Sequence, residues 1–140
     1  MKPWITHAIL AMVFAGFTSV IAKLGLTGIT GELGLAVRTC FVFLFVLIFS
    51  AFVVTPEQLA GLTTKNYLWL GLSGVTTSLS WIFYHKALKA GDVSTVALID
   101  KGSVVVALVL AYFILKEQLT VRMMGGGALM LAGLFIIAKK

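Results

Sequence analysis

The sequence predicts an all-α integral membrane protein with five transmembrane helices and no room for a soluble domain. Hydrophobic residues make up 60% of the 140 residues and charged residues only 11%, whereas soluble domains average about 45–50% and about 25%. The apolar residues are gathered in five stretches, each close to the roughly 20 residues that a helix needs to cross a bilayer. Glycine, proline and charged residues are concentrated in the short gaps between them. The chain therefore has membrane lipid as its solvent.

The predicted spans form a single domain that covers residues 1–140. They comprise residues 4–23, 33–54, 66–85, 94–115 and 121–138. Gly31 lies in the gap between the first two spans, and Pro56 lies in the next gap. The last two gaps, 86–92 and 116–120, carry most of the loop charges. Such helix breakers and charges are typical of the ends of membrane spans.

Basic residues in the loops and at the ends of the spans are divided almost evenly between the two membrane faces. Five spans place the two termini on opposite faces. The face of the N-terminus holds Lys2, Lys65, Lys116 and Arg122. The other face holds Lys23, Lys86, Lys89, Lys139 and Lys140. Because orientation follows an imbalance of Lys and Arg, the sequence specifies it only weakly, and insertion in both directions is an open alternative.

Several classes of function are excluded by the polar residues. The net charge of +6 is spread over loops and chain ends without a basic run, which favours contact with lipid headgroups over nucleic-acid binding. Cys40 is the single cysteine, and no His, Cys, Asp or Glu residues have metal-ligand spacing. There is no nucleophile–base or paired-carboxylate arrangement. The sequence thus predicts no enzyme, no metal and no cofactor.

Charged residues inside the spans are the strongest candidates for function, because each costs on the order of 2.5–3.5 kcal/mol at the centre of a bilayer. Arg38 and Asp100 each lie about six residues from the same membrane face, roughly 9 Å deep, and we expect them to pair. Lys101 points about 100° away from Asp100 around an ideal helix. We therefore do not expect Asp100 and Lys101 to share a face.

Two interpretations of the embedded polar residues stay open. In the first, they line a polar pathway that opens toward one face, and the two aromatic residues stack on a substrate. The pathway residues would be Lys23, Arg38, Trp81, Tyr84, Asp100 and Lys101. In the second, the Arg38–Asp100 pair only fixes helix packing and Lys101 extends to the headgroups. The aromatic residues are then interfacial anchors.

Small residues form stripes on the last two spans, and such stripes drive helix association in lipid. They are Ser103, Ala107, Ala111, Gly125, Gly126 and Ala132. These residues pack either within one bundle or against a second copy of the chain. Gly102, directly after Lys101, predicts a bend or an unwound turn in the fourth span, and broken helices often carry binding sites in membrane proteins.

Four segments occur in a recognisable order. Residues 81–92 (WIFYHKALKAGD) end the third span, residues 96–101 (VALIDK) begin the fourth, and residues 115–119 (LKEQL) precede the glycine-rich fifth. Residues 36–39 (AVRT) begin the second span. In these segments and their spacing, the whole chain resembles an EamA-type five-helix unit of the drug/metabolite transporter superfamily.

This resemblance implies one half, or one repeat unit, of an inverted-repeat transporter, since most family members carry two such units in opposite orientations. A single unit would need a second copy inserted upside down, or a separately encoded half. The implied function is secondary transport or export of small metabolites, such as amino acids, across the plasma or inner membrane by an antiparallel homodimer. Arg38, Lys101 and Lys23 would attract a substrate carboxylate or phosphate, and Asp100 would exchange a counter-ion or proton.

Two departures from the family pattern limit these expectations. Many family units have a proline early in the fourth span, where residues 100–103 (DKGS) stand here, and this leaves the substrate open. The first span has no acid, unlike the first helix of the related small multidrug resistance proteins. Proton-coupled export of cationic drugs through such an acid is therefore not expected. The alternative function is a non-transporting membrane subunit that stabilises or regulates a larger complex.

Overall fold

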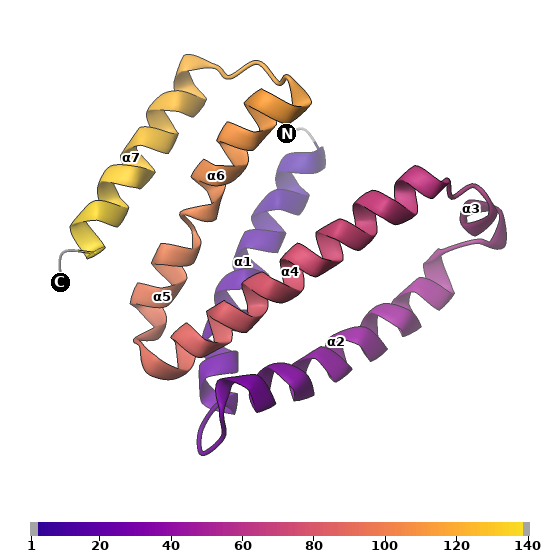
Figure 1. Cartoon of the computed structure of the whole chain (residues 1–140), viewed down its shortest axis with the longest axis horizontal. Coiled ribbons are helices and arrows are strands. Elements are labelled where there is room, and N and C mark those ends of the chain that lie inside the picture. Colours follow the sequence, from indigo (N-terminus) through magenta and orange to yellow (C-terminus); the bar gives the residue numbers. More distant parts are fainter. Residues whose placement is uncertain (1–2, 139–140) are drawn as a thin grey trace. The chain divides into compact units, whose positions relative to one another are not determined.

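The computed structural model describes residues 3–138, and helices are the only regular secondary structure in this range. The all-α prediction is therefore confirmed. The chain, shown in Figure 1, divides into two compact units. The central unit is Val20–Ala90, and the terminal unit combines Met1–Ser19 with Gly91–Lys140. Helix α1 (Pro3–Gly25) contributes residues to both.

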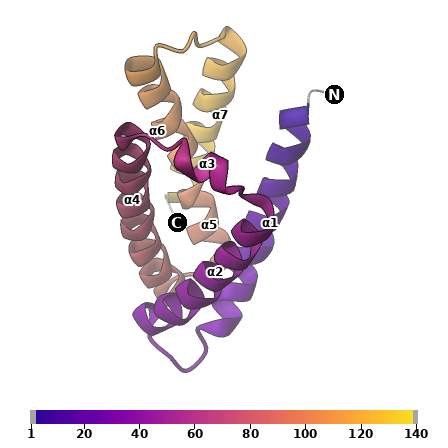
Figure 2. The ribbon, with the colours of Figure 1, turned by 90° about the vertical axis from the view of Figure 1, so that its right-hand side faces the viewer.

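Two long helices that pack against each other make up most of the central unit. They are α2 (Gly31–Val53) and α4 (Thr64–Ala90), and Figures 1 and 2 show that they run in opposite directions. The loop before α2 turns at Gly28, whose φ of +76° favours glycine. Thr30 then caps α2, because its hydroxyl oxygen accepts the backbone N–H of Leu33 at 3.2 Å.

A short helix lies between α2 and α4, in a gap where no helix is predicted from the sequence. Helix α3 (Pro56–Ala60) begins with a proline and a capping box. Gln58 Oε1 accepts the Thr55 N–H at 3.0 Å, and Thr55 Oγ1 accepts the Gln58 N–H at 3.4 Å. Both features are strong helix starts. In the first turn, the backbone N–H of Glu57 and the Thr55 hydroxyl lower the pKa of the exposed Glu57 carboxyl.

The fourth predicted span, residues 94–115, is a broken helix in the terminal unit. It consists of α5 (Val93–Asp100), α6 (Ser103–Leu110) and the π-helical turn η1 (Ala111–Leu115). A turn at Lys101 and Gly102 separates α5 from α6, which confirms the interruption expected at Gly102. At the far end, Lys116 adopts a left-handed conformation with φ of +57° and ends η1.

Helix α7 (Val121–Ala138) coincides with the fifth predicted span and packs against α5 and α6. Two glycines lie at these contacts. A Cβ on Gly127 would be 3.2 Å from Leu108 Cδ1, and a Cβ on Gly102 would be 2.9 Å from Leu134 Cδ1. The absent side chains thus let the helices of this unit approach closely.

Most side chains of both units are exposed, and many of the exposed side chains are apolar. Large exposed hydrophobic residues include Phe14, Phe41, Phe45, Leu70 and Phe135. The buried residues within the described part of the chain are Leu26, Gly31, His85, Leu88 and Gly127. Soluble monomers rarely expose continuous apolar surface on this scale. The exposed surface is instead suited to contact with lipid tails.

Three helical stretches are long and apolar enough to cross a membrane: Pro3–Gly25, Gly31–Val53 and Val93–Leu115. Helix α4 is long enough, with 27 residues, but its many Ser, Thr, Gly and Lys residues make it more polar. The apolar part of α7, Val121–Ile137, is shorter. All five predicted segments are helical, whereas the count of five membrane spans stays a prediction. Helix α4 also extends to Ala90, beyond its predicted end at residue 85, because only a short turn precedes α5.

Candidate substrate-binding site

Arg38 of α2 stacks on the indole ring of Trp81 of α4. Its guanidinium carbon lies 4.6 Å from the ring centroid, and both residues are half-buried. Such a cation–π contact is worth about 0.5–1 kcal/mol at an exposed site and about 2 kcal/mol when desolvated. Within the described central unit, Arg38 forms no ion pair. Stacking fixes the plane of the guanidinium and leaves its edge, with its fork of N–H donors, available to a planar oxyanion.

Trp81 begins a row of side chains on one side of α4. The row continues through Tyr84, His85 and Leu88, at the three- and four-residue spacing that aligns residues along a helix. Tyr84 is half-buried and meets His85 edge to face, with ring centroids 5.9 Å apart and an interplanar angle of 75°. The structure thus brings Arg38 and Trp81 together and places Tyr84 one turn further along α4. Stacking of these aromatic rings on a substrate stays a prediction.

His85 is almost completely buried, with 2% of its surface exposed. Its Nδ1 donates a hydrogen bond to the Trp81 carbonyl oxygen at 2.9 Å, so the neutral ring carries its lone pair on Nε2. Nε2 is buried and has no hydrogen-bond partner among the described residues. Leaving such a group unsatisfied costs about 1–3 kcal/mol. The four-residue spacing of His85 from Trp81 indicates that both lie on one side of the helix, but the sequence does not show that Nε2 lacks a partner.

Lys23 and Lys89 connect the C-terminal ends of α1 and α4. The Lys23 ammonium donates to the carbonyl oxygens of Leu88 at 2.5 Å and Lys89 at 3.4 Å. In return, the Lys89 ammonium donates to the carbonyl oxygen of Leu26 at 2.9 Å. Cations are favourable at helix C-termini, where carbonyl groups lack partners within the helix. Lys23 therefore has a structural role, and its predicted contact with a substrate stays a prediction.

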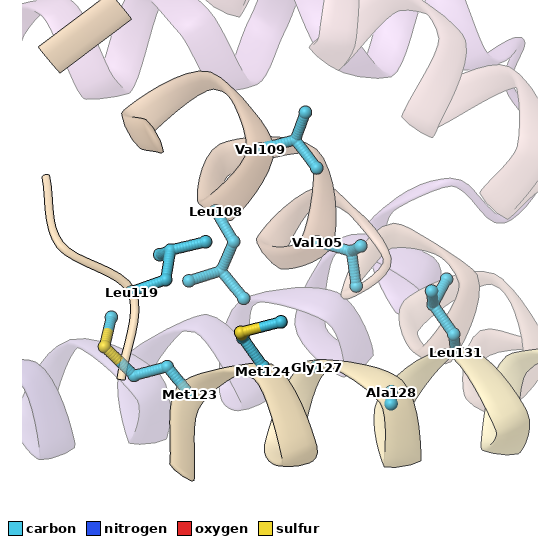
Figure 3. Close-up of a pocket in the computed structure, with 9 residues that line it drawn as sticks. All are labelled: Val105, Leu108, Val109, Leu119, Met123, Met124, Gly127, Ala128 and Leu131. Carbon is cyan, nitrogen blue, oxygen red and sulfur yellow. The ribbon is translucent and has the colours of Figure 1, made fainter. Parts of the chain in front are cut away.

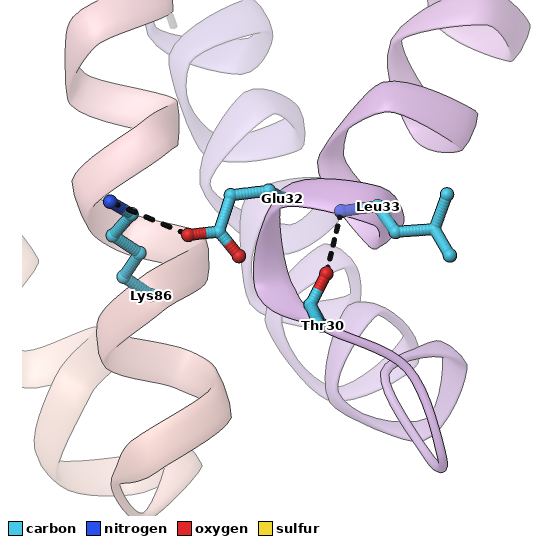
Figure 4. A network of polar contacts seen from close by, with 4 residues as sticks. All are labelled: Thr30, Glu32, Leu33 and Lys86. Atoms are coloured by element: carbon cyan, nitrogen blue, oxygen red, sulfur yellow. Dashed lines mark hydrogen bonds and ion pairs between the residues drawn. The ribbon is translucent and has the colours of Figure 1, made fainter.

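Glu32 and Lys86 form an ion pair across the start of α2 (Figure 4). Their charged atoms are 3.4 Å apart, and more than half of each side chain is exposed. Exposed pairs of this kind contribute about 0–1 kcal/mol. Glu32 also lies in the first turn of α2, where a negative charge complements the helix dipole. The pair is an ordinary surface contact at the edge of the site.

In the terminal unit, Asp100 pairs with the residue that follows it. The Asp100 carboxylate and the Lys101 ammonium are 3.5 Å apart. The long lysine side chain can reach its neighbour although the two positions lie about 100° apart around an ideal helix, so the expectation that they do not share a face stays a prediction. Helix α5 ends at Asp100, and Lys101 and Gly102 in the turn that follows keep right-handed helical backbone angles. A charge pair at a break between two helices resembles the polar sites that broken helices provide in transporters.

The predicted ion pair between Arg38 and Asp100 stays a prediction. Arg38 belongs to the central unit and Asp100 to the terminal unit. Each has a contact within its own unit: Arg38 with Trp81, and Asp100 with Lys101. Over residues 3–138, no group of three or more His, Cys, Asp or Glu side chains could hold a metal ion. The charged groups available to bind a ligand in each unit are therefore basic side chains and isolated carboxylates, beside backbone carbonyl oxygens.

An apolar groove lies between α6 and α7 of the terminal unit, with a volume of about 250 Å³. It is lined by Val105, Leu108, Val109, Leu119, Met123, Met124, Gly127, Ala128 and Leu131. Figure 3 shows Leu108, Leu119 and Met124 pointing toward one another between the two helices. The groove has no charged lining residue, so it is a packing surface and not a site for a charged substrate.

Most residues of the predicted small-residue stripes are exposed in the terminal unit and do not pack closely against another helix. A Cβ on Gly125 or Gly126 would meet no atom within 4 Å. The exposed stripe residues also include Ser103, Ala107 and Ala132, whereas Ala111 is half-buried. Gly127, the next glycine of α7, makes the close contact with α6. The predicted role of the exposed stripe residues in contact with a second copy stays a prediction.

Comparisons with known sequences identify one family of membrane proteins. The model of the EamA-like transporter family matches residues 2–139. The chain is also 31% identical over 137 residues to a Sinorhizobium protein described as an uncharacterized transporter in the cobO 3' region. That match covers 98% of this chain and 97% of the relative. No solved structure shows a significant match. The chain is thus a multi-pass membrane protein, and it belongs to the EamA-like transporter family.

Proposed function

We propose that the chain is a secondary transporter of small metabolites that carry a carboxylate, such as amino acids, and that Arg38 binds this group. The observation that carries the proposal is the half-buried guanidinium stacked on Trp81 without a carboxylate partner in its own unit. A cation at this depth in a span is expensive unless it has a partner or a function. A carboxylate accepts two parallel N–H bonds from the edge of a guanidinium.

The chemistry of the remaining polar residues supports further parts of this proposal. Lys101 would supply a second positive charge to the pathway. Asp100, which pairs with Lys101, would exchange a counter-ion or proton when the substrate binds. The break between α5 and α6 supports this role, because the turn can change without unwinding a complete helix. Lys23 would act indirectly by holding the end of α4, and Trp81 and Tyr84 would contact the apolar part of the substrate.

The working assembly that we propose is an antiparallel homodimer of five-helix units. Two observations support it: the nearly equal numbers of basic residues on the two predicted faces, and the open surface at Gly125 and Gly126 of α7. Glycines on a helix surface allow close approach by another helix in lipid. Alternating access would follow when one unit rocks against the other.

Counterflow in proteoliposomes tests the proposal, since exchange needs no knowledge of the driving ion. Liposomes containing the purified protein and an unlabelled carboxylate would receive the same compound in radiolabelled form, drawn from a panel of amino acids and 2-oxo acids. The Arg38→Gln variant should lower the initial rate about 10- to 100-fold, since hydrogen bonds to charged groups are worth about 1.5–3 kcal/mol. Arg38→Lys should retain part of the rate, because it keeps the charge without the fork of donors.

Arg122→Gln is the matched control, because Arg122 is exposed at the start of α7. This variant should exchange like the unaltered protein. Equal rates for Arg38→Gln and the unaltered protein would contradict the assignment of Arg38. The absence of exchange for every compound tested would contradict carboxylate transport and favour the non-transporting membrane subunit.

A further inference from the structure

The Nε2 atom of His85 is a buried hydrogen-bond acceptor that the proposed transport site does not use. The ring is fixed in one tautomer, because Nδ1 donates to the Trp81 carbonyl oxygen at 2.9 Å. The lone pair on Nε2 has no partner among the described residues, and the residue is 2% exposed. Native proteins satisfy nearly all buried polar atoms, so each exception needs a physical explanation.

Helices α2 and α4 approach each other closely at His85. Gly31, the first residue of α2, is buried against the backbone of α4, and a Cβ on it would be 2.9 Å from the His85 carbonyl oxygen. Leu26 and Leu88 are the fully buried apolar residues of the same unit, at 3% and 0% exposure. We call this group of buried residues, Leu26, Gly31, His85 and Leu88, the α2–α4 junction. Its opening would be needed before solvent could reach Nε2.

The charged and titratable groups around the junction already have other contacts. Those contributed by α1, α2 and α4 are Lys23, Glu32, Arg38, Tyr84, Lys86 and Lys89. Glu32, the single acid of this set, pairs with Lys86. The Lys23 and Lys89 ammonium groups donate to carbonyl oxygens, and Arg38 stacks on Trp81. No carboxylate contacts Nε2, so a proton there would create a buried positive charge without an ionic partner.

We propose that His85 Nε2 is a proton-binding site whose occupancy is incompatible with the closed α2–α4 junction. Binding forms one N–H bond from a solvent proton, breaks no bond in the protein and converts the imidazole to imidazolium. The closed junction excludes this charge from water, whereas an opened junction would hydrate it. A ligand that binds one of two conformations better shifts the population toward that conformation. Acidification therefore opens the junction, whether or not Arg38 binds a carboxylate.

Nitrogen NMR of histidine-labelled protein in lipid nanodiscs tests the first half of the proposal. The chain has two histidines, and a His7→Gln variant would leave His85 as the only signal. While the junction is closed, we expect Nδ1 to carry the hydrogen and Nε2 to be bare, and on acidification Nε2 gains its proton. A bare Nδ1 at high pH, or an Nε2 that stays bare at low pH, would overturn the proposal.

Spin-label distances test the second half. Labels at Thr39→Cys on α2 and Ala87→Cys on α4, in a Cys40→Ser background, occupy exposed positions on either side of the junction. Once acidification begins to open the junction, the ratio of opened to closed populations should rise about tenfold per pH unit, as linkage to a single proton requires. Its midpoint should match that of the Nε2 protonation. In His85→Gln the distance should not respond to pH, whereas His7→Gln should respond like the parent.

Two results would overturn the linkage: a distance change that persists in His85→Gln, or Nε2 protonation without a change in distance. Where His85→Gln does not fold, the comparison of midpoints in the unaltered His85 protein decides. Coinciding midpoints support the proposal, and separate midpoints contradict it.

Discussion

Gly31 of α2 and His85 of α4 meet through their backbones. A Cβ on Gly31 would be 2.9 Å from the His85 carbonyl oxygen, 3.1 Å from its carbonyl carbon and 3.3 Å from the Lys86 nitrogen. These atoms belong to the helix backbone and cannot rotate away as a side chain would. The contact therefore requires glycine at residue 31, and it sets the distance between the two main helices of the central unit.

Gly31→Ala should destabilise the protein by about 1–3 kcal/mol, as overpacking of a close contact commonly does. Thermal unfolding in detergent, followed by circular dichroism, would measure the change. Gly71→Ala is the matched control, since Gly71 is also within a helix but has open space at its Cβ position. It should be neutral or stabilise by about 0.5–1 kcal/mol, because alanine favours the helix. Equal effects of the two substitutions would contradict the close contact.

The stacking of Arg38 on Trp81 predicts an energetic coupling between these residues. A double-mutant cycle with Arg38→Gln and Trp81→Leu should give a coupling of about 0.5–2 kcal/mol in unfolding free energy. Trp81→Phe should retain part of it, because an aromatic face remains. The same cycle between Arg38 and the exposed Trp69 serves as the control and should give no coupling. Additive effects for Arg38 and Trp81 would show that the stack does not form.

The hydrogen bonds donated by the Lys23 ammonium predict that removing this group lowers the stability of the protein. Lys23→Met retains the apolar stem but removes the donor to the Leu88 and Lys89 carbonyl oxygens. The loss should be about 1.5–3 kcal/mol, as for other hydrogen bonds from charged groups. Lys65→Met removes an exposed lysine at the opposite end of α4 and should change the melting temperature little. The same small effect for Lys23→Met would contradict its structural role.

The close contact between Gly102 and Leu134 predicts that the stability of the terminal unit depends on the size of both residues. Its Cβ position is 2.9 Å from Leu134 Cδ1 and 3.0 Å from the Ile99 carbonyl oxygen. Gly102→Ala should therefore destabilise the protein by about 1–3 kcal/mol. Combining it with Leu134→Ala should lose less stability than the sum of the single changes, because the smaller residue makes room for the new methyl group. Additive melting shifts would instead attribute the effect of Gly102→Ala to the backbone alone.

Much of the fold could be predicted from apolar length and helix breakers. Residues 121–138 form α7 as predicted, and the break at Gly102 is present. The missed helix α3 has local signals, namely Pro56 and the Thr55–Gln58 capping box. A search for apolar stretches passes over a polar helix of five residues, even when its sequence carries such signals.

The site was less predictable, because side-chain partners depend on how helices meet. Embedding and charge identified Arg38, but its contact with Trp81 depends on how α2 and α4 pack. The Asp100–Lys101 pair was not predicted, because neighbouring positions on an ideal helix point about 100° apart. Likewise, sequence spacing cannot show that His85 Nε2 lacks a partner. Whether a buried polar atom finds a hydrogen-bond partner depends on every helix and loop packed around it.

The proposed antiparallel homodimer of EamA-like units can be tested by measuring the topology of the chain in intact cells. Single cysteines would replace Thr27, Gln58, Asp92 and Gln118, one in each connection between the long helical segments, in a Cys40→Ser background. A membrane-impermeant maleimide would then label the cells from outside. An antiparallel homodimer requires partial labelling of every site, because each connection lies outside the cell in half of the molecules. Full labelling of Thr27→Cys and Asp92→Cys with none of the other two, or the reverse, would mean a fixed orientation and contradict the antiparallel homodimer.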